Sequence, residues 1–172
     1  MEIIVVSDTN IFIDLIETGL LEQFFLLPME VHTTDIVIAE ITIEEQKAAI
    51  LSIVEKGSLK IKTYSSDEML KLFNFINSKQ RRYDLHPADF SVWQYSSENG
   101  YTLLTGDGNL RKAAQADGVE VHGTIYVIDK LVEHQLLTPS LAADRLELLY
   151  SINPRQPKPE IEKRLKKWRG SL

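Results

Sequence analysis

Residues 3–10, Ile-Ile-Val-Val-Ser-Asp-Thr-Asn, begin with four apolar residues and reach a carboxylate at Asp8. A short apolar run of this kind, bounded by polar residues, predicts a buried strand over residues 3–7. Helical periodicity follows from Asn10 to about Leu27, where apolar residues recur three and four positions apart. The segment therefore predicts a strand whose carboxyl end leads directly into a helical region.

The alternation of strand-length and helix-length segments continues along the rest of the chain. Such alternation is typical of α/β folds with a mainly parallel sheet. Further strands are predicted at residues 31–34, 59–64, 101–105 and 119–121. Helices are predicted at residues 43–56, 65–78, 87–99, 109–116, 124–133, 138–150 and 160–169, together with a short helix that has Asp35 as its N-cap.

The composition is that of one soluble globular domain, with 172 residues of which 44% are hydrophobic and 26% are charged. The chain contains no cysteine, which excludes disulfides, zinc–thiolate sites and a cysteine nucleophile. The first residues lack a basic leader and a cleavage site, and no apolar run approaches the ~20 residues that cross a bilayer. We therefore expect a cytoplasmic protein.

The net charge of −6 is unevenly distributed along the chain. Residues 153–172 carry seven basic and two acidic side chains, whereas residues 1–152 carry twelve basic and twenty-three acidic ones. An acidic body is a poor general binder of nucleic acid, because phosphate contacts depend on lysine and arginine. Any nucleic acid that this protein handles would therefore need a bound metal and local basic patches.

The predicted organisation of the chain changes at the same boundary. Residues 1–152 are expected to form the main domain, and residues 153–172 a proline-rich linker followed by a basic amphipathic helix. Ile161, Leu165 and Trp168 share one face of that helix, which is expected to dock on protein. The tail has three interpretations: an arm that contacts RNA, a helix that docks on a partner or second subunit, or a helix folded back on its own acidic body.

Four carboxylates, Asp8, Glu40, Asp89 and Asp107, lie where a predicted strand or loop leads into a helix. The carboxyl ends of parallel strands open into one crevice, so we expect these side chains to converge. Converging acids repel one another unless a multivalent cation neutralises them. The sequence therefore predicts a site for a hard divalent metal, and phosphodiester hydrolysis is a reaction that commonly uses such a site.

Taken singly, each acid also has a structural explanation, as a helix cap, an Asx turn, a partner of a helix dipole or a solvated charge. Their joint arrangement favours the metal site, because Asp8 and Asp107 both follow strongly apolar strands. Asn10 adds a neutral oxygen ligand two residues after Asp8, and Thr105 adds a hydroxyl two residues before Asp107.

Several motifs together resemble those of one known family. They are Asp-Thr-Asn at 8–10, Glu40 on the following helix, Ala-Asp at 88–89, and Leu-Leu-Thr-Gly-Asp-Gly-Asn-Leu-Arg-Lys-Ala-Ala at 103–114. Over about residues 3–135 the chain resembles the PIN-domain nucleases, and most of all the VapC-type toxin ribonucleases of toxin–antitoxin systems. The resemblance implies a three-layer α/β/α PIN-like fold with a central mainly parallel sheet, Mg²⁺ or Mn²⁺ as cofactor, and RNA as substrate. It also implies frequent homodimers and inhibition by an antitoxin protein.

Carried over by position, the resemblance assigns a role to each matching residue. The catalytic set is Asp8, Glu40, Asp89 and Asp107; the metal ligands are Asp8, Asp89 and Asp107; and the supporting residues are Asn10, Thr105 and Asn109. Many relatives have another acid where this chain has Asn109, so the number of bound ions stays open. A metal in this site would lower the pKa of a bound water and orient the scissile phosphate, while Glu40 would hold an outer-sphere water or act as the base.

Four basic residues near the predicted site, Arg81, Arg82, Arg111 and Lys112, are candidate RNA contacts or simply solvated charges. Two other classes of function compete with the ribonuclease. One is a catalytically weak PIN-like module that binds a partner or assembles, which Asn109 and the acidic surface favour. The other is a phosphotransfer enzyme with Asp8 as nucleophile, which ranks lower because such enzymes usually carry a second acid where Asn10 stands.

Overall fold

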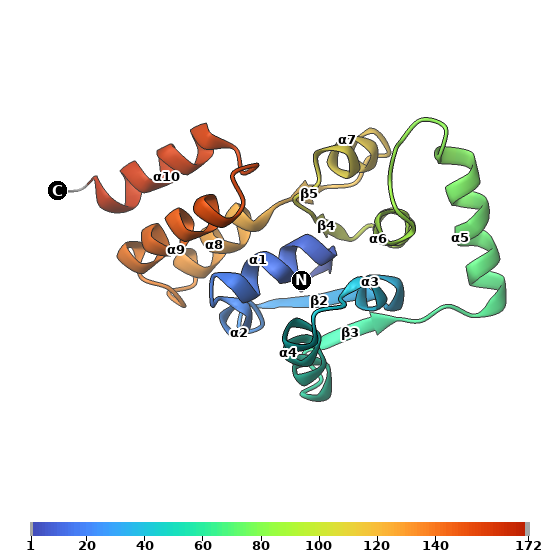
Figure 1. The fold of residues 1–172 in the computed structure, drawn as a ribbon, viewed down its shortest axis with the longest axis horizontal. Helices are drawn as coiled ribbons and strands as arrows, with labels where there is room; N and C mark the ends of the chain where they lie inside the picture. The colour runs from blue at the N-terminus through green and yellow to red at the C-terminus, as the bar shows by residue number, and fades with distance from the viewer. Residues whose placement is uncertain (1, 171–172) are drawn as a thin grey trace.

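The computed structural model describes residues 2–170, which fold around one parallel β-sheet (Figure 1). Within these residues the sheet has five strands in the order β3-β2-β1-β4-β5. They are β1 (Ile3–Ser7), β2 (Met29–Thr34), β3 (Leu59–Lys62), β4 (Thr102–Leu104) and β5 (Val121–His122). Every pair of neighbouring strands is parallel, so the predicted α/β fold with a mainly parallel sheet is confirmed.

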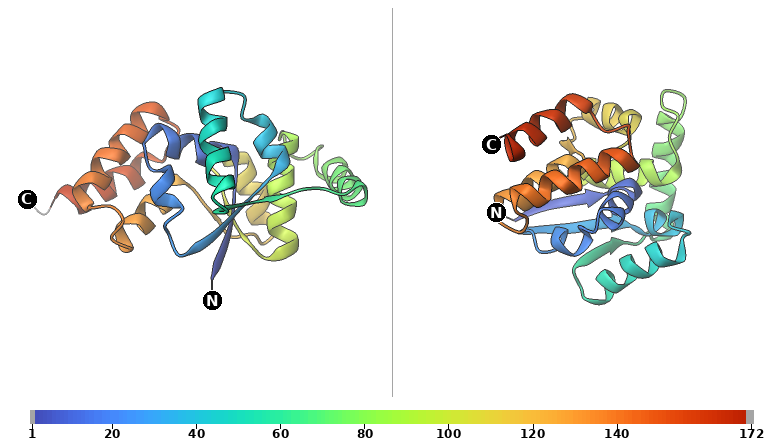
Figure 2. Two further views of the ribbon diagram at one scale, coloured as in Figure 1. Left: turned by 90° about the horizontal axis from the view of Figure 1, so that it is seen from below. Right: turned by 60° about the vertical axis from the view of Figure 1, so that its left-hand side comes forward.

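Helices cover both faces of the sheet (Figures 1 and 2). The helices are α1 (Thr9–Glu17), α2 (Leu21–Phe24), α3 (Asp35–Glu40), α4 (Glu44–Glu55), α5 (Ser66–Lys79), α6 (Pro87–Asn99), α7 (Gly108–Ala116), α8 (Thr124–Glu133), α9 (Pro139–Ile152) and α10 (Lys158–Arg169). Of these helices, none that the structure describes is both long and apolar enough to cross a membrane.

The strand order reverses at β1, and this reversal creates the crevice of the fold. The chain moves outward from β1 to β3 and then returns across β1 to β4 and β5. Right-handed crossovers therefore place α1 and α4 on one face of the sheet and α6 and α7 on the other. In open parallel sheets, ligands bind where the strand order reverses, which here is the carboxyl end of β1 and β4.

The central strand β1 is held in place by the core and by its register with β4. Val5 and Val6 are fully buried, and Ser7 of β1 is paired with Leu104 of β4. The next backbone N–H, that of Asp8, donates to the Leu104 carbonyl at 2.9 Å. The strand pairing therefore fixes how residue 8 is aligned with the end of β4.

Helix ends mostly follow local sequence signals, with one correction. Pro87 begins α6, as expected for the helix predicted at residues 87–99, and Gly100 ends it in the left-handed conformation. The prediction that Asp35 is the N-cap of α3 was wrong: the N-cap is Thr34, whose hydroxyl accepts from the Val37 N–H at 3.1 Å. Thr34 has the extended backbone that a cap needs, and Asp35 occupies the first helical turn.

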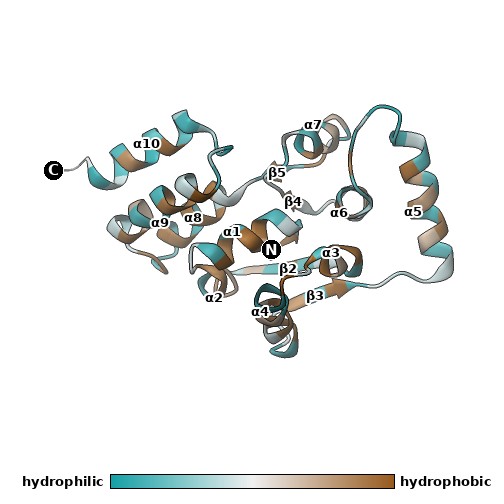
Figure 3. Cartoon of the chain, in the orientation of Figure 1, coloured by the Kyte–Doolittle hydropathy of each residue, from teal (hydrophilic) through white to brown (hydrophobic). Residues whose placement is uncertain are grey.

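The C-terminal helix α10 packs on α9 of its own chain (Figures 1 and 2). Figure 3 shows α10 as mostly hydrophilic with a short hydrophobic band. Ile161 of this helix is only 2% exposed, and Leu165 and Trp168 are partly buried against the core. At the end of the helix, Arg169 pairs with Asp144 and Glu147 of α9. Of the three interpretations of the tail, the structure agrees with a helix folded back on its own chain. The division of the chain into residues 1–152 and 153–172 stays a prediction.

Truncation of Ile161 tests how strongly α10 is attached. Ile161→Ala is expected to lower the free energy of unfolding by about 2–4 kcal/mol, because it leaves a cavity between α9 and α10. The matched control is Ile152→Ala, since Ile152 is 42% exposed and its truncation should cost less than about 1 kcal/mol. Urea unfolding followed by circular dichroism measures both values, and equal losses in the two variants would contradict the buried contact.

Candidate functional site

Asp8 is the most buried carboxylate at the carboxyl edge of the sheet. It follows β1 as the N-cap of α1, and it is only 1% exposed. Its Oδ1 accepts from the Thr9 N–H at 2.7 Å, and its Oδ2 accepts from the Thr105 hydroxyl at 2.8 Å. The carboxylate is therefore fixed by donors from α1, which follows β1, and from the loop that follows β4.

Asp107 lies just beyond the neighbouring strand β4 as the N-cap of α7. Its Oδ1 accepts from the N–H groups of Asn109 and Leu110, at 2.8 and 2.9 Å. Its own N–H donates to the Thr105 hydroxyl at 3.1 Å. Thr105, which is fully buried, therefore links the two acids: its hydroxyl donates to Asp8 and accepts from the backbone of Asp107.

Asp89 approaches from the first turn of α6. It is 8% exposed, and its Oδ2 accepts from the His86 N–H at 2.8 Å, which closes a capping box at the helix start. Burial is the main reason that its pKa is raised above the usual value, and the charges of Asp107 and Glu40 raise it further. Asp89 therefore lies within electrostatic reach of two other members of the predicted set.

Glu40 is the last residue of α3 and is exposed. Its Oε2 accepts from the Thr9 hydroxyl at 3.0 Å, so it is attached to the residue that follows Asp8. Sequence reasoning missed this role of Thr9, although its position inside the Asp-Thr-Asn motif was a signal. The hydrogen bond joins the end of α3 to the start of α1.

The four acids form one electrostatically connected cluster. Burial raises the pKa of Asp8 to about 7, and the charge of Asp89 is the next largest cause, with a smaller contribution from Glu40. The hydrogen bonds from Thr105 and Thr9 act in the opposite direction but do not offset the burial. A cation placed among these groups would favour their charged forms.

The donor set matches a hard divalent cation in its chemistry. Asp8, Asp89 and Asp107 offer carboxylate oxygens, which Mg²⁺ and Mn²⁺ prefer, and Asn10 adds an exposed amide oxygen nearby in sequence. Within residues 2–170, however, no three histidine, cysteine, aspartate or glutamate side chains are already arranged as a metal site. Each carboxylate retains lone pairs beyond its present hydrogen bonds, so the residues fit such an ion.

A cleft of about 790 Å³ lies beside Asp107. Asn10, Asp107 and Asn109 line one part of it, and Arg111 of α7 lines its wall. The other predicted RNA contacts lie elsewhere: Lys112 is exposed on α7, and Arg81 and Arg82 are exposed in the loop between α5 and α6. Of the four basic candidates, Arg111 is therefore the one that the fold brings to the cleft beside the acids.

Comparison with known proteins identifies relatives of the chain. Residues 4–169 match the family DUF3368, which is described as a PIN domain. A search of curated proteins finds no significant match. Among solved structures the chain is similar to PAE2754 from Pyrobaculum aerophilum, with 12% identity, a TM-score of 0.52, and coverage of 77% of this chain and 99% of that one. It is also similar to FitAcB from Neisseria gonorrhoeae, with 14% identity, a TM-score of 0.41, and coverage of 68% and 95%. At these identities the first likeness supports the fold alone.

The raised pKa of Asp8 predicts how stability depends on pH in metal-free protein. An acid whose pKa is higher in the folded state than in the unfolded state binds more protons when folded. Stability should therefore fall as pH rises from about 4 to about 7, with an upper limit of roughly 4 kcal/mol for a shift of this size. Asp8→Asn should remove most of this fall and be more stable than wild type at pH 8.

Urea unfolding in EDTA at pH 5 and pH 8 measures this effect. Asp84→Asn is the control, because it removes the same charge from an exposed position. If wild type and Asp8→Asn lose stability equally between the two pH values, the buried carboxylate is not the cause.

Proposed function

The chain belongs to the PIN-domain family DUF3368, and from this membership we propose that it is a metal-dependent ribonuclease, the toxin of a toxin–antitoxin pair. One observation carries the proposal: Thr105 hydrogen-bonds both to Asp8 and to the backbone of Asp107 where the strand order reverses. Asp89 is coupled to both acids through charge. Such a cluster is suited to holding a cation against a phosphodiester.

Asp8, Asp89 and Asp107 would hold Mg²⁺ or Mn²⁺. When bound, the ion would lower the pKa of a water molecule and stabilise charge on the phosphate oxygens. Thr105 keeps the Asp8 carboxylate in one orientation, and Asn10 and Asn109 present amide groups to the cleft beside Asp107. Glu40, anchored by Thr9 and open to solvent, orients a water molecule at the edge of the cluster.

Arg111 is the basic residue that we assign to RNA, because it lines the cleft beside Asp107. Arg81, Arg82 and Lys112 are exposed and would contact more distant phosphates of a longer strand. The expected partners, an antitoxin protein and a second copy of the chain, follow from the resemblance to VapC-type toxins. The cytoplasmic location was expected from the sequence and stays a prediction.

A catalytically weak PIN-like module that binds a partner is the second candidate. The observation that favours it is Asn109, an exposed residue that lines the cleft and stands where many relatives have an acid. With one carboxylate fewer, the site would hold a second ion less strongly.

RNA cleavage by the purified protein distinguishes the two functions. Wild type should cleave a mixed pool of single-stranded RNA in the presence of Mn²⁺ or Mg²⁺. Asp8→Asn should reduce the rate by a factor on the order of 100 or more, because it removes a charged ligand from the cluster. Asp84→Asn should cleave as wild type does. If wild type leaves RNA intact with both metals from pH 6 to pH 9, the binding module becomes the better proposal.

Substitution of Thr105 tests the bridge between the acids. Thr105→Val removes the donor to Asp8 and leaves the Asp107 N–H without its acceptor. We expect a rate loss on the order of tenfold or more and a stability loss of about 1–3 kcal/mol. Thr105→Ser keeps the hydroxyl and should retain most of the activity. Equal rates for the valine and serine variants would show that the bridge does not position the acids.

A further inference from the structure

We infer that the cleft beside Asp107 binds one unpaired nucleotide of an RNA strand, with the base against His122 and Tyr126 and the flanking phosphates on Arg111 and Arg155. This inference rests on the proposed ribonuclease function, which it extends by assigning a substrate subsite. The subsite is composed of α7, β5, α8 and the C-terminal linker, which includes Arg155.

The position and size of the cleft suit a nucleotide adjacent to the acids. It is lined by Asn10 and Asp107 at the acidic cluster and by four linker residues, Asn153, Arg155, Gln156 and Pro157. Its volume of about 790 Å³ lies within the roughly 300–1,000 Å³ that is usual for sites of small organic ligands. A strand whose phosphodiester lies at Asp8 and Asp107 could therefore place the neighbouring nucleotide in this space.

Arg111 offers a positioned guanidinium to the cleft. Its Nη1 donates to the Val121 carbonyl at 3.3 Å and its Nη2 to the Thr105 carbonyl at 3.4 Å. Gly123 makes room for it, because a Cβ at that position would lie 3.2 Å from Nη2. Arg111 forms no ion pair with a carboxylate of residues 2–170, so its remaining N–H donors are available to a phosphate.

Arg155 supplies a second guanidinium from the linker. The residue is exposed, lines the same cleft, and pairs with no acid in the part of the chain that the structure describes. The other arginine of the cleft, Arg164, is instead occupied by Asp129 and Glu160. Arg164 offsets one of those two negative charges, and Arg111 and Arg155 are the cleft arginines that form no ion pair among residues 2–170.

An aromatic pair provides the surface for a base. The rings of His122 and Tyr126 are stacked, with centroids 4.0 Å apart and an angle of 11° between their planes. Both residues line the cleft, and the His122 side chain is 32% exposed. Lys130 Nζ lies 5.4 Å from the Tyr126 ring centroid, which adds a positive charge beside the pair. Nucleobases stack on aromatic faces, whereas a free phosphate makes no such contact. The combination of aromatic rings and arginines therefore favours a nucleotide.

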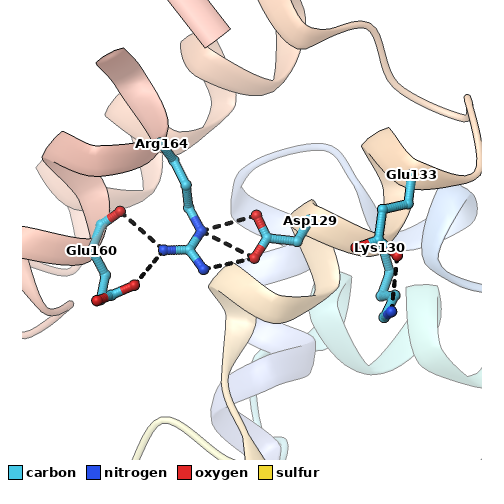
Figure 4. Close-up of polar contacts among 5 residues, drawn as sticks. All are labelled: Asp129, Lys130, Glu133, Glu160 and Arg164. Atoms are coloured by element: carbon cyan, nitrogen blue, oxygen red, sulfur yellow. Dashed lines mark hydrogen bonds and ion pairs between the residues drawn. The ribbon is translucent and has the colours of Figure 1, made fainter. Parts of the chain in front are cut away.

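Ion pairs hold the linker side of the cleft in position (Figure 4). Arg164 of α10 donates to both carboxylate oxygens of Asp129 in α8, at 2.7–3.0 Å, and to Glu160 at 2.5 Å. On α1, the buried carboxylate of Asp14 accepts from the Thr124 hydroxyl at 2.7 Å and from the Gln156 amide at 3.3 Å. The wall is therefore ordered before a ligand enters, which lowers the entropy cost of binding.

Binding in EDTA tests the subsite independently of cleavage. The probe is a fluorescein-labelled, unstructured RNA octamer, and the full chain is titrated at several salt concentrations by fluorescence anisotropy. Tyr126→Leu should weaken binding roughly fivefold or more with the salt dependence unchanged, because it removes stacking. Arg155→Gln should weaken binding and also reduce the slope of log K against log salt by about 0.7, because it removes one phosphate contact. Lys166→Gln is the charge-matched control on the exposed side of α10 and should change neither value.

Each outcome of this titration decides the inference. Any of three results would overturn it. The first is that Tyr126→Leu and Arg155→Gln both bind the octamer as tightly as wild type does. The others are that wild type does not bind the octamer, or that it binds a glutamate octapeptide equally well. Because no metal is present, a selective loss in the cleft variants supports the subsite even if the protein cleaves no RNA. Conversely, Mn²⁺-dependent cleavage with unchanged affinities would leave the nuclease proposal intact and remove the subsite.

Discussion

The buried hydroxyl of Thr105 is the contact on which the site depends. It satisfies one oxygen of Asp8 and one backbone N–H of Asp107, and so it joins the two strands between which the chain changes direction. Without such donors, an acid as buried as Asp8 would be still harder to ionise. The fold brings carboxylates together, and the hydrogen bonds offset part of the free-energy cost of burying their negative charges. A bound cation would offset more of that cost.

The tail illustrates how charge composition can mislead. Residues 153–172 are strongly basic in sequence, but Arg164 and Arg169 pair with acids of α8, α9 and α10. Two of the tail's seven basic side chains therefore attach α10 to α8 and α9. Arg155, in the linker before the helix, is the basic residue of the tail that lines the cleft without such a pairing in the described chain.

Local signals in the sequence predicted most of the fold. The strand predicted at residues 3–7 and the helix predicted at residues 87–99 depend on signals that act over a few residues, and both matched the structure. The cap of α3 was missed because Thr34 and Asp35 are both good caps, and only the backbone conformation distinguishes them. Carboxylates that follow strands could be expected to converge, whereas the cleft could not be predicted. Its wall depends on a contact between Asp14 and Gln156, which are 142 residues apart and carry no shared pattern.

Helix α1 is attached to both sides of the site. Its N-cap is Asp8, and Asp14 within the helix holds Thr124 and Gln156. With a rise of 1.5 Å per residue, these two carboxylates are separated by about 9 Å along the axis. The length of this part of α1 therefore sets the distance between the acidic cluster and the linker. A bend or shift of α1 would move both ends at once, so the spacing between the acidic cluster and the linker depends on a single helix.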